Sequence, residues 1–105
     1  MNSDPATDRI AGAAALMKAL ASPLRLAIVV ELQAGARCVH ELQAALGAAG
    51  RTVSQPLMSQ HLKVLRDAGL VVPTRRAQEM AYALVDGRVT NLVDDAMRAG
   101  LAGAR

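Results

Sequence analysis

The chain of 105 residues almost lacks aromatic side chains, because Tyr82 is the only one and there is no phenylalanine or tryptophan. A core without aromatic rings must be built from leucine, valine, isoleucine, methionine and alanine. Alanine, leucine and methionine are strong helix formers, whereas aromatic residues favour strands. The composition therefore predicts a mainly helical protein. At this length we expect a single domain over residues 1–105, small enough to gain stability from a partner subunit.

Cysteine is equally scarce, and the single Cys38 excludes an intrachain disulfide. No apolar run approaches the roughly 20 residues that span a bilayer, and no segment has the pattern of a secretory signal. We therefore expect a protein of the reducing cytoplasm that does not bind membranes. The formal net charge is only +3, a mild basic bias that is compatible with a polyanionic partner but does not by itself indicate one.

Helical periodicity and capping residues organise most of the chain. After a frayed arm at residues 1–6, Thr7 is expected to N-cap the first helix. Ser22 and Ser54 are each followed closely by a proline, a pattern typical of helix starts, and Asp86 is expected to cap the last helix. The expected helices cover residues 7–21, 23–34, 39–46, 55–68 and 86–102.

A hairpin and two apolar stripes complete this pattern. Two short runs with β-branched residues flank Ala77-Gln78-Glu79, which predicts a β-hairpin over residues 70–85. The first and last helices each carry an apolar stripe with no obvious place in so small a core. These stripes could pack within one chain, but their length favours a homodimer in which residues 7–21 and 86–102 form the interface.

Residues 39–68 have the outline of a helix-turn-helix, whose second helix enters the major groove of DNA. Glutamine reads base edges, serine reaches bases or phosphates, and lysine and arginine neutralise phosphates. The side chains expected at the groove are Ser54, Gln55, Ser59, Gln60, His61 and Lys63, with Arg66, Arg75 and Arg76 on phosphates. The same polar face also fits an ordinary solvated surface, and His61 fits a structural role equally well.

Four strings of residues resemble the ArsR/SmtB family of dimeric bacterial repressors. They are Ala19–Arg25, Arg37–Leu42, Ser59–Val71 and Tyr82–Leu84. The resemblance implies a winged helix-turn-helix fold, mainly α with a β-hairpin wing between the fourth and fifth helices. It also implies a homodimer that represses transcription by binding double-stranded DNA at a palindromic operator. An inducer, often a metal ion or an oxidant, releases such repressors.

Two departures from the family pattern concern DNA docking. Eight residues separate Leu46 from Gln55, whereas helix-turn-helix proteins usually have a turn of about three residues. At the wing tip, the usual Gly-Arg pair falls on Ala77-Gln78, which removes a cation that commonly reaches the minor groove. Both departures motivate an alternative function, a winged-helix protein-interaction module that no longer binds DNA.

A third departure concerns the zinc ligands that some family members place on the last helix. The resemblance maps these ligands onto Asp86, Arg88, Ala99 and Ala102. Only Asp86 could ligate, whereas a zinc site needs about four nitrogen, sulfur or oxygen donors. We therefore expect no zinc site on the last helix.

The family's other metal site falls at the start of the third helix, on Cys38 with His40 or Glu41. Its usual partners are cysteines or histidines in the N-terminal arm of the other subunit, where this chain offers only Asp4 and Asp8. These hard oxygen donors match a soft thiolate poorly. We therefore expect no cofactor and no metal, with zinc binding at Cys38, His40 and Glu41 as the alternative.

Two other interpretations of Cys38 are a buried cysteine with no chemical role and a redox sensor. A lone cysteine commonly behaves as a small buried hydrophobe, and a redox role would need exposure and a lowered pKa. Catalysis is not expected, because Cys38 and His40 stand two apart on an expected helix and would lie on different faces. We therefore predict a regulator without enzyme activity.

Overall fold

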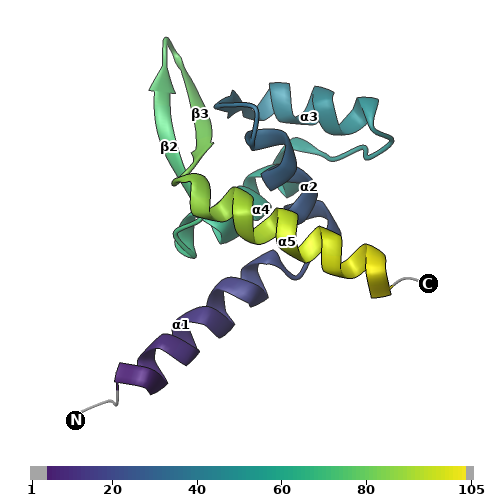
Figure 1. The fold of residues 1–105 in the computed structure, drawn as a ribbon. Coiled ribbons are helices and arrows are strands. Elements are labelled where there is room, and N and C mark those ends of the chain that lie inside the picture. The colour runs from purple at the N-terminus through teal and green to yellow at the C-terminus, as the bar shows by residue number, and fades with distance from the viewer. Residues whose placement is uncertain (1–4, 104–105) are drawn as a thin grey trace.

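The computed structural model describes residues 5–103, with side chains from residue 5 to residue 100, and this part of the chain forms five helices and three short strands (Figure 1). The elements are α1 (Pro5–Leu20), α2 (Pro23–Leu32), β1 (Arg37–Cys38), α3 (Val39–Ala48), α4 (Gln55–Asp67), β2 (Val71–Arg76), β3 (Glu79–Leu84) and α5 (Gly87–Gly103). The predicted fold class, a mainly α winged helix-turn-helix with a β-hairpin wing, is confirmed.

Three of the predicted N-caps are confirmed. The Ser22 hydroxyl accepts from the Arg25 backbone N at 3.2 Å, and the Ser54 hydroxyl accepts from the Leu57 backbone N at 3.2 Å. A proline follows each serine within the first two helical positions, where its missing N–H costs nothing. Asp86 caps α5 in the same way, accepting from the Arg88 backbone N at 2.8 Å. These caps satisfy amides that would otherwise lack partners.

The first helix begins earlier than the sequence pattern indicated. α1 starts at Pro5, so Thr7 lies inside its first turn and does not cap it. Proline is well tolerated at the first helical position because that residue's N–H has no intrahelical partner. Of the expected arm over residues 1–6, Pro5 and Ala6 are helical, and residues 1–4 lie outside the described part of the chain.

The third helix was expected to end at Leu46, just before Gly47, but α3 continues to Ala48. Gly50 terminates α3 instead, with φ +85 and with the Arg51 backbone N bonded to the Leu46 carbonyl at 2.8 Å. This is the bonding pattern of a helix that closes on a left-handed glycine, a conformation that residues with a Cβ seldom adopt. The connection to α4 is therefore shorter than the eight residues counted from Leu46, since it covers only residues 49–54.

A short strand that the sequence did not reveal joins the wing to α3. β1 pairs antiparallel with β3, opposing Arg37 to Tyr82 and Cys38 to Ala81, and the sheet order is β1-β3-β2. Two residues are too few to show an alternating pattern, so no periodicity could predict β1. Its consequence is that the residue before α3 is fixed directly to the wing.

The core forms among α2, α3, α4, α5 and the base of the wing. The largest fully buried side chains are Ile28, Val29, Leu42, Leu46, Met58, Leu62, Leu65, Leu70, Val71 and Val93. α1 contributes mainly its end, Ala19 and Leu20, while the rest of the helix projects away from the body (Figure 1). Ile10 and Met17 on α1 are 70% and 62% exposed, so the expected apolar stripe has no cover within one chain.

No single helix of the described chain is long and apolar enough to cross a bilayer. α1 and α2 reach the required length and hydropathy only when taken together, and they meet at a bend of 93°.

Candidate nucleic-acid interface

α4 is fixed at both ends and along one face, which determines the side chains that it presents outward. Met58, Leu62 and Leu65 are buried, and Ser54 caps the start of the helix. At its end, Gly69 has φ +76 and the Leu70 backbone N bonds the Leu65 carbonyl at 2.9 Å. This closing pattern stops the helix sharply before β2. The opposite face of α4 is therefore held rigidly toward solvent.

The outward face of α4 carries polar side chains that have no partner within the described chain and can therefore bind another molecule. Gln55, Ser59 and Gln60 are exposed, and within the described chain their side chains make no hydrogen bond or ion pair. Gln55 and Ser59 are four residues apart, so they lie on one side of the helix. Amide and hydroxyl groups in this arrangement can pair with base edges in the major groove.

Two cations extend this face toward the end of α4. Lys63 Nζ bonds an Asp67 carboxylate oxygen at 2.7 Å, and Arg66 Nε lies 3.8 Å from the other oxygen. The bond from Lys63 lowers the pKa of Asp67. The Lys63 and Asp67 side chains are 66% and 56% exposed, and such exposed pairs are weak. Lys63 can therefore exchange its carboxylate partner for a DNA phosphate.

His61 has a different environment from the other predicted groove residues. Its Nδ1 lies 3.2 Å from an Arg25 guanidinium nitrogen, and the Arg25 Nε donates to the Ala19 carbonyl. Partial burial, together with the charge of Arg25, lowers the pKa of His61. A neutral ring with Nδ1 accepting from Arg25 ties α4 to α2 and to the end of α1. This contact favours the structural role that the sequence left open.

The two wing arginines differ in their partners. Arg75 is exposed, and its guanidinium makes no bond to any described residue. Arg76 forms an ion pair with Glu41, which raises the pKa of Arg76, and donates to the Ala36 carbonyl at 3.4 Å. Arg75 is thus the free cation of the wing, whereas Arg76 fastens the wing to the start of α3.

The Glu41 side chain bonds both Cys38 and Arg76. Its carboxylate accepts from the Cys38 backbone N at 2.8 Å, and it also receives the Cys38 thiol and the Arg76 guanidinium. These contacts, led by the backbone bond, lower the pKa of Glu41 from 4.5 to about 2. A glutamate three residues after the N-cap is a common helix-capping arrangement. Glu41 therefore holds α3 and the wing, which makes it a poor candidate for a metal ligand.

The connection before α4 is anchored even though it is longer than usual. Val53 is buried in the core, and the Gln43 side-chain amide donates to the Val53 carbonyl at 3.0 Å. The sequence signal for this anchor was one apolar residue between Thr52 and Ser54, too little to stand out. The extra residues therefore do not leave α4 loosely attached.

A cysteine, a histidine and a glutamate meet where α3 and the wing join. Cys38 Sγ lies 3.4 Å from His40 Nδ1, which in turn lies 3.2 Å from a Glu79 carboxylate oxygen. The expectation that thiol and imidazole cannot face each other is wrong, because Cys38 precedes α3 as its N-cap and does not follow helical geometry. Glu79 was not among the predicted residues, since only the pairing of β1 with β3 brings it here.

The last helix does not fit the family's zinc site. An Arg88 guanidinium nitrogen lies 2.7 Å from an Asp86 carboxylate oxygen, and this contact lowers the pKa of Asp86. The same carboxylate caps α5. The only expected ligand on that helix is therefore already paired with a cation, which a metal ion would have to displace.

Comparisons with known proteins give one consistent answer. A sequence profile described as "Bacterial regulatory protein, arsR family" matches residues 22–72. The HTH-type transcriptional repressor SmtB of Mycobacterium tuberculosis is 44% identical over 93 residues, which cover 89% of this chain and 65% of the relative. The chain thus spans just under two thirds of the length of that curated relative.

Solved structures share the fold over most of their length. A homodimeric winged helix-turn-helix DNA-binding domain from Mycobacterium bovis has a TM-score of 0.80 at 26% identity, covering 95% of this chain and 88% of that one. The transcriptional repressor BigR from Xylella fastidiosa has a TM-score of 0.72 at 33% identity, covering 90% of this chain and 92% of that one. With its matching profile, fold and recognition helix, this chain belongs to the ArsR family of bacterial regulatory proteins.

Proposed function

We propose that this chain is a sequence-specific DNA-binding repressor of transcription that acts as a homodimer and has no catalytic role. The observation that carries the proposal is the outward face of α4, where unpaired Gln55, Ser59 and Gln60 stand beside Lys63 on a helix capped at both ends. The relatives SmtB and BigR are themselves named repressors, which supports this function. A regulator of bacterial transcription acts in the cytoplasm, where the chromosome lies.

The assignment of roles follows from the surroundings of each side chain. Gln55, Ser59 and Gln60 are proposed to contact bases, and Lys63, Arg66 and Arg75 to contact phosphates. Ser54 and the amides at the start of α4 favour a phosphate as well, because helix N-termini attract anions. His61 and Arg76 act mainly by holding the recognition helix and the wing in place.

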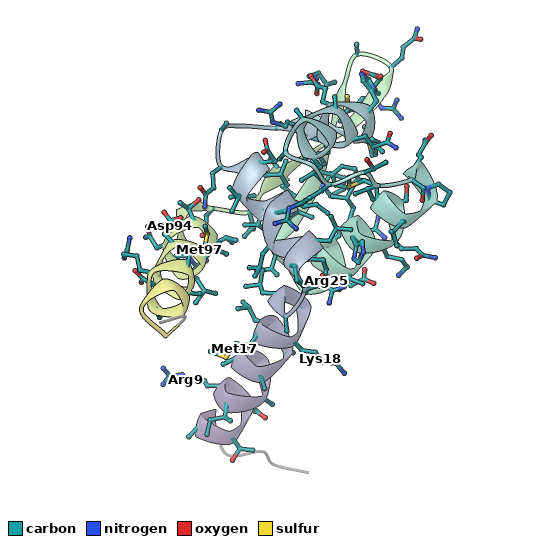
Figure 2. The ribbon with its side chains drawn as sticks, turned by 90° about the vertical axis from the view of Figure 1, so that its right-hand side faces the viewer. Arg9, Met17, Lys18, Arg25, Asp94 and Met97 are labelled. Atoms are coloured by element: carbon teal, nitrogen blue, oxygen red, sulfur yellow. The ribbon has the colours of Figure 1, made fainter. Side chains whose placement is uncertain are left out.

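The homodimer is supported by surfaces that one chain leaves uncovered. Figure 2 shows Met17 and Lys18 on opposite sides of α1, and Met17 is among the most exposed apolar side chains of the chain. A hollow of about 260 Å³ opens between α1, α2 and α5, lined by Met17, Leu20, Leu26, Leu92, Val93 and Ala96. The M. bovis neighbour is described as homodimeric. In a helix-turn-helix dimer, recognition helices about 34–36 Å apart read a palindrome across one turn of DNA.

A salt titration against the DNA upstream of the chain's own gene tests this function, run with a chelator and then with zinc. Binding to DNA should weaken steeply as salt rises, because Lys and Arg displace counterions. Lys63→Ala should weaken binding to operator and unrelated DNA alike and reduce the salt slope by about 1. Gln60→Ala should relax the choice at one base pair, at a cost of about 1–3 kcal/mol in discrimination.

Arg98→Ala is the matched control, since Arg98 is exposed on α5, pairs with Asp95 and lies outside the recognition helix. Its DNA affinity and salt slope should equal those of the wild type. If all three variants and the wild type bind DNA equally weakly and without dependence on salt, the chain is a winged-helix protein-interaction module.

A further inference from the structure

Arg25 lies at the start of α2, where the projecting α1 joins the body of the molecule (Figure 2). Its Nε donates to the Ala19 carbonyl at 2.5 Å, and one of its terminal nitrogens lies 3.2 Å from His61 Nδ1. We propose that Arg25 is a positioning residue for operator recognition, which acts through His61 to set the angle between the recognition helix α4 and the dimerisation helix α1. This inference rests on the proposed function and adds to it a residue outside the DNA-binding face.

The chemistry of arginine suits this coupling. The guanidinium group is planar and its N–H groups point in fixed directions, whereas a lysine is a single point charge on a flexible stem. Bonds to Ala19 and His61 therefore hold the end of α1 and the middle of α4 in one relative orientation. The rest of α1 projects beyond its buried end, so a change at this junction tilts the whole projecting helix relative to α4 (Figure 1).

The angle between α1 and α4 matters for bases more than for phosphates. In a helix-turn-helix dimer, the two recognition helices must enter grooves one turn of DNA apart. If α1 forms the interface, its angle to α4 decides whether both helices meet their half-sites. Base edges are read by directional hydrogen bonds, while phosphates are bound largely by charge. Loss of the Arg25 contact should therefore reduce discrimination between DNA sequences more than it reduces affinity for DNA in general.

The contact between Arg25 and His61 requires an uncharged imidazole ring. A guanidinium only donates, so His61 Nδ1 must accept and the ring proton must lie on Nε2. Protonation of His61 places a hydrogen on Nδ1 and a second positive charge beside Arg25, which removes the bond. Partial burial and the charge of Arg25 lower the pKa of His61 from its usual 6.5, so the ring is uncharged at neutral pH.

Arg25 is the one charged group of the described chain that acts on the pKa of His61. α4 packs against α1, α2, α3 and β2. The other charged or titratable groups on these elements and on α4 itself are Asp8, Arg9, Lys18, Glu31, His40, Glu41, Lys63, Arg66, Asp67, Arg75 and Arg76. A pH effect that disappears when Arg25 is replaced therefore reports on this contact.

The test is the ratio of the affinity for the upstream DNA to the affinity for unrelated DNA, measured at about pH 8 and about pH 5, the range in which histidine titrates. The wild-type ratio should fall about tenfold on acidification, because a hydrogen bond from a charged donor is lost. Arg25→Met keeps the apolar stem without a donor, and its ratio should be low at both pH values. His61→Asn should give a ratio that does not change with pH, because its oxygen accepts in the place of Nδ1 and does not titrate.

Arg98→Met is the matched control, since Arg98 is an exposed arginine that pairs with Asp95 on α5. Its ratio should follow the wild type at both pH values. Circular dichroism should show that all three variants fold. Without DNA, an NMR titration of the imidazole signal that His61→Asn lacks should show a higher pKa of His61 in Arg25→Met than in the wild type.

The outcomes separate this inference from the proposed function. If the wild type prefers the upstream DNA, but Arg25→Met keeps the wild-type ratio and its pH dependence, the positioning role is wrong and the proposed function stands. A ratio for His61→Asn that falls with pH as the wild-type ratio does also overturns the positioning role. If the wild type prefers neither DNA at either pH, the proposed function itself fails, and the positioning role fails with it.

Discussion

Ala77 is the one residue of the wing whose backbone conformation conflicts with its side chain. It is the first of the two residues that connect β2 to β3, and its φ of +55 is the only positive value at a non-glycine residue in the described chain. Two-residue hairpin turns favour glycine at such a position, because a Cβ there crowds the backbone. The Cβ of Ala77 therefore gives this turn a small local strain.

Replacing Ala77 with glycine is expected to stabilise the protein by about 0.5–1 kcal/mol, since the relief of strain exceeds the added entropy of the unfolded chain. Urea unfolding of both proteins measures the difference. Gln78→Gly is the control, because Gln78 has no positive φ, and it should leave stability unchanged or lower it. Destabilisation by Ala77→Gly would mean that the turn does not hold this conformation in solution.

Glu41 provides a pH-dependent contribution to stability. Its pKa is lowered from 4.5 to about 2 in the folded chain, so the folded state favours the ionised carboxylate. The resulting stabilisation is complete above the unfolded pKa and is lost as pH falls from about 4.5 to about 2. Asp67 and Asp86, whose pKa values are lowered too, contribute with the same sign.

Glu41→Gln should therefore lower stability at neutral pH and reduce the loss of stability between neutral pH and about pH 3. The comparison isolates Glu41, because Asp67 and Asp86 are present in both proteins. Unfolding free energies at the two pH values give the result. An equal pH dependence in variant and wild type would show that the bonds to Cys38 and Arg76 do not form in solution.

At the scale of elements, the position of α4 depends on its caps, on its buried face and on one polar contact to α2. Ser54 begins the helix, Gly69 ends it, and His61 links it to α2 through Arg25. A recognition helix must be held in a fixed register for its side chains to meet the bases, so these contacts serve the proposed function without touching DNA.

Ser54→Ala should destabilise the protein by about 1 kcal/mol, because the Leu57 backbone amide loses its acceptor. Ser54→Asp should retain most of the stability, since aspartate is an equally good cap. Ser59→Ala is the matched control on the same helix: its hydroxyl has no partner among the described residues, and its effect should stay within about 0.5 kcal/mol. Thermal unfolding of the three variants would contradict this account if Ser54→Ala and Ser59→Ala were alike.

At the scale of the whole molecule, the projecting α1 is the feature that one chain does not explain. Met17 and Ile10 are mostly exposed although apolar, whereas Ala19 and Leu20 at the end of the same helix are buried. If a second chain covers this surface, a charge placed there is buried at the interface without a partner. Met17→Glu should therefore weaken dimerisation by about a hundredfold or more, and operator binding with it.

Sedimentation of the variant across a range of concentrations measures this effect. Val72→Glu is the control, since Val72 is an exposed apolar residue on the wing strand β2, far in sequence from α1. It should leave the dimer intact. A Met17→Glu protein that dimerises like the wild type would show that α1 lies outside the interface.

The sequence by itself determined the features that depend on local chemistry. Serine followed by an early proline predicted the starts of α2 and α4, and helical periodicity predicted that residues 55–68 form the second helix of the helix-turn-helix. These signals are local, because capping and helical periodicity involve residues within a few positions of each other.

Only the tertiary structure decided the contacts between distant segments. The pairing of β1 with β3 placed Glu79 beside Cys38, and the packing of α2 on α4 placed Arg25 beside His61. Gly50, and not Gly47, ended α3, because the choice between two nearby glycines depends on which one the fold holds at positive φ. Contacts between residues roughly 40 positions apart leave no periodic trace in a single sequence, since each depends on how whole elements pack.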